Sequence, residues 1–127
     1  MRLRRKSAAL VLSSLAFLPA CLVLADKNPF FAAPYGAATV AAVAYHSSEE
    51  QAFIAIDHGC AYAVIAANVW MFFHSPSPIY ALGAASLILL SLACYLRAHA
   101  GNYCAYHTAW HLLAGSGGLV LAVGYRP

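Results

Sequence analysis

Two histidines near the C-terminus, His107 and His111, are spaced four residues apart. On an α-helix this spacing places both imidazoles on one face, one turn apart. Two side chains placed in this way can share one metal ion, because neutral imidazole is a common zinc ligand. The alternative is that each histidine makes a hydrogen bond to a neighbouring helix. The spacing indicates a metal site and leaves this structural role open.

A third histidine and one aspartate would complete such a site. His46, from another helix, would give zinc three nitrogen ligands and leave one position open, which is the form of a catalytic zinc site. Zinc lowers the pKa of a water in the open position towards about 7. Asp57, an acid expected inside the membrane, could orient that water and take its proton. Asp57 could instead pair with His58 or Arg97 in a structural role. A haem fits less well, because its two axial ligands approach from opposite faces.

Apolar segments must position these residues. Hydrophobic residues make up 63% of the 127-residue chain and charged residues only 9%, whereas soluble domains carry about 25% charged residues. Lipid must therefore cover most of the surface, and a spanning helix needs about 20 apolar residues. Five segments meet or approach this requirement, at about residues 7–25, 30–46, 52–73, 79–97 and 103–125. We expect an all-α transmembrane helical bundle of about five helices, forming a single domain over residues 1–127.

The N-terminal segment has two interpretations and also sets the orientation. Its basic start, apolar run and small residues are typical of a retained helix or of a cleaved signal peptide, which would leave four helices. Arg2, Arg4, Arg5 and Lys6 favour a cytoplasmic N-terminus. Short loops then bring the end of the second helix and the starts of the third and fifth helices to that same side. We expect an integral, multi-pass membrane protein with its metal site on the cytoplasmic side. Basic residues do not alternate with aromatic ones, so we expect no nucleic-acid partner.

Two further features concern helix packing. Gly115, Gly117 and Gly118 make the last helix slender, which allows a neighbouring helix to approach closely. Asn68 lies 11 residues after Asp57 and therefore on the same helix face. We expect Asn68 to line the interior or to make a hydrogen bond between helices.

Three motifs together resemble a known family. His46 within Tyr-His-Ser-Ser, Asp57 11 residues later, and His107-Thr-Ala-Trp-His111 are similar to motifs of the CREST membrane hydrolases. That superfamily includes alkaline ceramidases, adiponectin-type receptors and proteins that remodel GPI lipids. The resemblance implies that His46, His107 and His111 bind Zn²⁺ and that Asp57 contacts the zinc-bound water. It also implies hydrolysis of an amide or ester bond in a membrane lipid, such as a sphingolipid.

The chain departs from the family pattern in two ways. The family has a serine four residues before its first histidine, where this chain has Ala42. The family also has seven helices, and here one helix instead of three separates the Asp57 helix from the last helix. A homo-oligomer could supply the missing wall. The expected function is therefore a zinc-dependent intramembrane lipid hydrolase, and the alternative is a non-catalytic membrane receptor or interaction protein with a structural zinc site.

Overall fold

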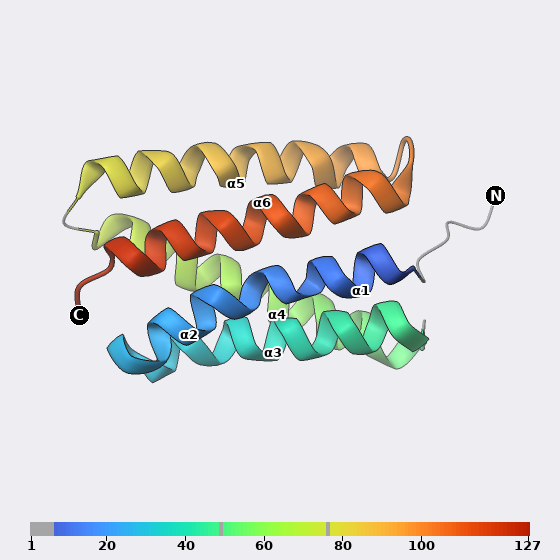
Figure 1. Cartoon of the computed structure of the whole chain (residues 1–127), viewed down its shortest axis with the longest axis horizontal. Coiled ribbons are helices and arrows are strands. Elements are labelled where there is room, and N and C mark those ends of the chain that lie inside the picture. The colour runs from blue at the N-terminus through green and yellow to red at the C-terminus, as the bar shows by residue number, and fades with distance from the viewer. Residues whose placement is uncertain (1–6, 49, 76) are drawn as a thin grey trace.

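The protein is an up-and-down helix bundle in which helices that follow one another in the chain run antiparallel (Figure 1). The computed structural model describes residues 7–48, 50–75 and 77–127. The basic cluster at residues 2–6, on which the expected orientation rests, lies outside these ranges. The elements are α1 (Ala8–Ser14), the 3₁₀ turn η1 (Leu15–Phe17), α2 (Leu18–Lys27), α3 (Pro29–Ser48), α4 (Gln51–Phe73), α5 (Pro78–Ala98) and α6 (Tyr103–Gly124). No strand occurs in the described ranges, so the all-α prediction is confirmed.

Local signals explain why the helices begin where they do. The Ser7 side chain accepts a hydrogen bond from the backbone N–H of Leu10, and Asn102 caps α6 through Ala105 in the same way. Such side-chain acceptors satisfy backbone donors that the first turn of a helix leaves unpaired. A proline opens α5, where its missing N–H costs nothing. The bounds of α3 to α6, and of the run formed by α1, η1 and α2, lie within two residues of the expected ranges.

The first helical run packs inside the bundle. It comprises α1, η1 and α2 and lies between α3 and α6, while α5 packs along α6 and α4 along α3 (Figure 1). Leu10, Ser14, Ala20 and Leu24 on this run are fully buried. The short 3₁₀ turn tightens the helix midway along its length without ending it. The N-terminal segment thus contributes a full face to the core.

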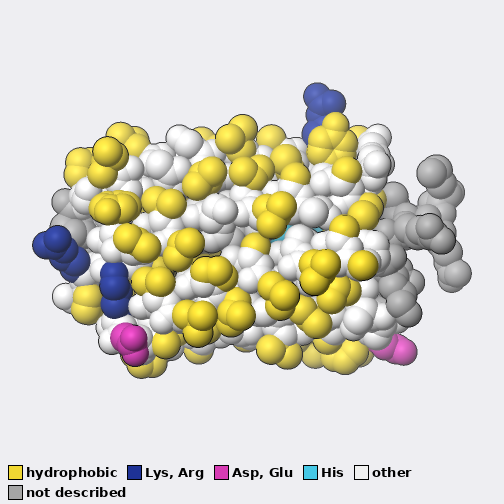
Figure 2. All heavy atoms as spheres, in the orientation of Figure 1, with side chains coloured by type: hydrophobic (Ala, Val, Ile, Leu, Met, Phe, Trp, Pro, Cys, Tyr) yellow, Lys and Arg dark blue, Asp and Glu magenta, His cyan; other side chains and the backbone are white. Residues whose placement is uncertain are grey.

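The surface is apolar over most of its length. Figure 2 shows hydrophobic side chains across the visible face, with acidic and basic side chains near the two ends of the bundle. Three helical runs of the described chain are long and apolar enough to cross a membrane, namely residues 8–27, 51–73 and 78–98. The other two expected spans, α3 and α6, run antiparallel to the helices that adjoin them in the sequence and carry the three histidines of the predicted site. These features are those of a membrane protein.

Glycines allow α6 to lie against its neighbours. A Cβ atom on Gly115 would lie 2.4 Å from the carbonyl oxygen of Ala16, and one on Gly118 would lie 2.6 Å from the Tyr35 ring. A Cβ on Gly117 would lie 2.9 Å from the Ile88 side chain. Each separation is shorter than van der Waals contact, so only glycine fits. The structure agrees with the close approach expected from this run of small residues.

Gly115→Ala should therefore destabilise the fold. The added methyl group meets the backbone of Ala16, which cannot rotate away as a side chain can. Overpacking of this kind costs about 1–3 kcal/mol, so the midpoint of thermal unfolding in detergent should fall. Gly59→Ala is the matched control, because a Cβ on Gly59 of α4 meets nothing within 4 Å. Equal midpoints for the two variants would contradict the close contact between α6 and the first helical run.

Lys27 binds the C-terminal end of α6. The Lys27 ammonium donates hydrogen bonds of 2.9, 2.9 and 3.1 Å to the carbonyl oxygens of Ala122, Val123 and Tyr125. The last carbonyls of a helix have no partner within the helix and carry partial negative charge. One cation from α2 thus satisfies the C-terminus of α6, at the end of the bundle away from the histidines (Figure 1).

Candidate metal centre

The structure brings His46, His107 and His111 together. One nitrogen from each ring lies within 4.8 Å of the others. The three side chains are 0%, 5% and 1% exposed, respectively. His46 comes from the last turns of α3, and the other two come from the first half of α6. Because successive helices alternate in direction, the C-terminal end of α3 and the N-terminal end of α6 lie at the same end of the bundle.

The three rings form a compact triangle suited to a metal ion. Their centroids are separated by 5.1 Å (His46–His107), 5.2 Å (His46–His111) and 4.7 Å (His107–His111). Two nitrogens bound to one tetrahedral zinc lie about 3.3 Å apart, given Zn–N bonds of about 2.0–2.1 Å. Small side-chain rotations would close the remaining distance. Three imidazoles suit zinc and also copper, iron or nickel, so the donor set fits a transition metal without selecting one.

Aromatic side chains surround the triangle. Tyr103 stacks on His107 with ring centroids 4.7 Å apart. Trp110 lies 4.8 Å from His107 and 4.9 Å from His111, and Phe17 meets His111 edge-on at 5.9 Å. An apolar shell of this kind limits the access of water to a metal site. The tryptophan between the two histidines of α6 therefore contacts both predicted ligands.

One polar contact of the site was missed from the sequence. The Ser13 hydroxyl, on α1, lies 2.9 Å from Nδ1 of His111. The hydroxyls of Thr39 and Ser47 lie nearer to His46 in the sequence, but each bonds a carbonyl of its own helix. No motif marks Ser13, because it is 98 positions from its partner and sits in an ordinary apolar run.

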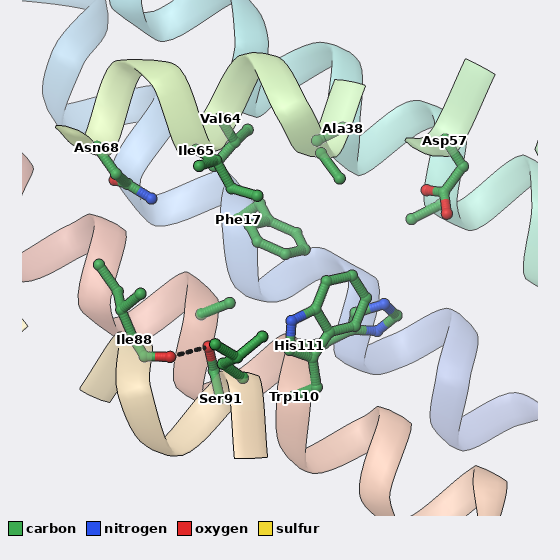
Figure 3. Close-up of a pocket in the computed structure, with 14 residues that line it drawn as sticks. Phe17, Ala38, Asp57, Val64, Ile65, Asn68, Ile88, Ser91, Trp110 and His111 are labelled. Atoms are coloured by element: carbon green, nitrogen blue, oxygen red, sulfur yellow. Dashed lines mark hydrogen bonds between the residues drawn. The ribbon is translucent and has the colours of Figure 1, made fainter. Parts of the chain in front are cut away.

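Asp57 and His111 line the same cavity. This cavity has a volume of about 230 Å³ and is lined by residues of η1, α3, α4, α5 and α6 (Figure 3). The Asp57 carboxylate enters it from α4, and His111 comes from α6 on the facing wall. Asp57 is not among the residues whose ligand atoms lie within 4.8 Å of one another. Asp57 therefore lines the cavity without belonging to the cluster of possible metal ligands.

The rest of the cavity wall is mainly apolar. Its other lining residues are Phe17, Ala38, Ala42, Ala61, Val64, Ile65, Asn68, Ile88, Ser91, Leu92, Trp110 and Ala114. Asn68 accepts a hydrogen bond from the Tyr35 hydroxyl, so it both lines the interior and joins two helices, as expected. Ser91, which the sequence did not single out, bonds the Ile88 carbonyl of its own helix (Figure 3).

The other histidines lie away from the triangle. His58 is exposed, and its Nδ1 lies 2.7 Å from the carbonyl oxygen of Ile54 in its own helix. His74 and His99 are exposed residues at the C-terminal ends of α4 and α5. None of these three histidines belongs to the cluster of possible metal ligands in the described part of the chain.

The site thus combines a buried three-nitrogen cluster with an apolar cavity that a carboxylate also lines. No protein-family model, curated protein or solved structure matches the chain. The observations on which a function can be proposed are therefore the histidine cluster, the cavity and the apolar surface.

Proposed function

We propose that the chain is a zinc-dependent intramembrane hydrolase that cleaves an amide (ceramide-like) or ester bond of a lipid. One observation carries the proposal. His111 belongs to a cluster able to hold a metal and also lines an apolar cavity together with Asp57. A ligand in this cavity would contact both His111, a possible metal ligand, and the Asp57 carboxylate. Metal-assisted hydrolysis uses a metal ion together with a general base of this kind.

Each group has a distinct role in this proposal. His46, His107 and His111 hold the ion, which, when bound, supplies a Lewis acid and an activated water at its open position. The Asp57 carboxylate oxygen accepts the proton of the attacking water and returns it to the leaving group. The apolar walls bind the hydrocarbon chain and exclude other water, which strengthens electrostatic interactions inside the cavity.

The substrate class follows from the cavity and the surface. The cavity wall is mostly aliphatic and aromatic, and the outer surface suits a bilayer. A lipid can reach such a site without leaving the membrane. The resemblance to the CREST hydrolases favours a sphingolipid or a related lipid. The basic N-terminal cluster favours a site on the cytoplasmic side.

Ala42 supports a second function. It lines the cavity where the family pattern has a serine four residues before the first histidine. A chain lacking that hydroxyl could keep the metal as a structural element and serve as a receptor or interaction protein. A homo-oligomer would fit either function, because a second copy could cover the side where the family has two more helices.

A lipid panel separates the two functions. Detergent-purified, zinc-loaded protein should release fatty acid or sphingoid base from ceramides or from ester lipids, as measured by mass spectrometry. His107→Ala, prepared identically, should release none, which excludes a contaminating hydrolase. A folded, zinc-loaded protein that releases neither product from the panel would overturn the hydrolase and favour the receptor.

A further inference from the structure

The Ser13 hydroxyl joins the first helix to the candidate metal centre. Its oxygen lies 3.1 Å from the carbonyl oxygen of Leu10 and 2.9 Å from Nδ1 of His111. Ser13 is 5% exposed and His111 is 1% exposed, so both partners are buried. We infer that Ser13 is a positioning residue of the metal centre, which holds the His111 ring so that Nε2 faces the ion. This inference rests on the proposed metal site and not on the proposed hydrolysis.

Proton counting supports this assignment. A serine hydroxyl carries one hydrogen, and a neutral imidazole carries one N–H. A carbonyl oxygen can only accept, so the Ser13 hydrogen is directed at Leu10 when both contacts are made. The Ser13 oxygen then accepts from Nδ1–H of His111, and the lone pair of that ring is left on Nε2. A metal ligand needs this unprotonated nitrogen.

The arrangement matches what metal-binding histidines generally require. Such a histidine usually donates its second N–H to an oxygen, which fixes the tautomer and the orientation of the ring. Here the oxygen comes from a hydroxyl on another helix and not from a carboxylate. Loss of a partner of this kind typically lowers metal affinity by about 10–100-fold.

Two further contacts join the first helical run to α6 near His111. One turn after Ser13, Phe17 meets the same His111 ring edge-on at 5.9 Å. Ala16 lies between Ser13 and Phe17 in the sequence, and its carbonyl group packs against Gly115 of α6, where the missing side chain allows the two helices to approach closely. The first helical run therefore fixes both the ring and the backbone of the ligand-bearing helix.

Ser14 provides a matched control. It is the next residue on α1 and is fully buried, and its hydroxyl also bonds the Leu10 carbonyl, at 2.8 Å. No hydrogen bond joins Ser14 to His111 in the described part of the chain. Ser13→Ala and Ser14→Ala thus remove the same atom from the same helix turn. Only the first variant removes the partner of a predicted ligand.

The test is zinc affinity of the full-length protein in detergent, measured by competition with a chromophoric chelator. Ser13→Ala should bind zinc about 10–100-fold more weakly, and its Co²⁺ form should show an altered visible spectrum. Ser14→Ala should keep the wild-type affinity and spectrum, and Ser13→Thr, which retains the hydroxyl, should stay close to them.

Three results would overturn the inference. These are wild-type affinity in Ser13→Ala, an equal loss in Ser14→Ala, or a Ser13→Thr variant as weak as Ser13→Ala. A wild-type protein that binds no zinc would instead overturn the metal site itself, and the hydrolase with it. A protein that binds zinc as described but cleaves no lipid leaves the role of Ser13 intact.

Discussion

His107→Ala and His111→Ala should each reduce bound zinc from about one ion per chain to almost none. Each variant leaves two imidazoles of the three that lie within 4.8 Å of one another. Removing a metal ligand should lower zinc affinity more than removing a residue that only hydrogen-bonds a ligand, so zinc affinity should fall by more than about 100-fold. Metal analysis of the detergent-purified proteins measures this directly. His46→Ala should behave in the same way, because its ring belongs to the same cluster.

Exposed histidines supply the controls. His58→Ala and His99→Ala remove imidazoles that bond carbonyls of their own helices and lie outside the cluster. Both variants should keep their zinc. Zinc retained in His107→Ala and His111→Ala, or lost equally in the controls, would contradict the assignment of the ligands.

The stability of the zinc-free protein distinguishes the two proposed functions further. A metal that acts as a structural element contributes its binding energy to folding, so a chelator should unfold the protein. In a catalytic site the bundle should stay helical without the ion, because its packing rests on the contacts of α6 with α5 and the first helical run. Circular dichroism before and after chelation measures the difference.

The helices and the level of the histidines could be predicted from local signals. Apolar length and turn residues located the ends of α3 to α6, and of the first helical run as a whole, to within two residues. Because the loops are short, helices that follow one another in the sequence must be antiparallel, and their ends fall into two layers. His46 and His107 could therefore be placed in one layer without any knowledge of side-chain contacts.

Contacts between distant segments could not be predicted in this way. Ser13 looks like any small polar residue in an apolar helix, and its role depends on how that helix rotates against α6. The separation of Asp57 from the three histidines likewise depends on how α4 packs around the cavity that both Asp57 and His111 line. Helical periodicity fixes which residues share a face, but packing fixes which face meets which.

Three helical runs of the described chain are apolar enough to cross a membrane, and the histidines of the candidate site lie outside them. α3 and α6, which bear the three histidines, fall outside the three runs found on length and apolar composition. Ionisable residues within membrane segments are costly and generally functional. The two long helices outside these three runs thus carry the three histidines of the candidate site.

Asp57→Asn should abolish most lipid hydrolysis while leaving zinc bound. The substitution keeps the size of the side chain but removes its capacity to accept a proton, and general-base catalysis contributes about 100–10,000-fold to a rate. The carboxylate lines the cavity but is not one of the clustered ligand atoms, so zinc content should stay near one per chain. Product release by mass spectrometry and metal analysis on the same sample give both readouts.

Asp26→Asn is the matched control for this variant. Asp26 is an exposed acid on α2, near the end of the bundle away from the histidines, and it does not line the cavity. Its replacement changes net charge as Asp57→Asn does and should leave turnover unchanged. Wild-type turnover in Asp57→Asn would remove this residue from the mechanism. Loss of zinc in that variant would instead show that Asp57 supports the metal, because a residue acting only on the substrate has no effect on the affinity of the three histidines for the ion.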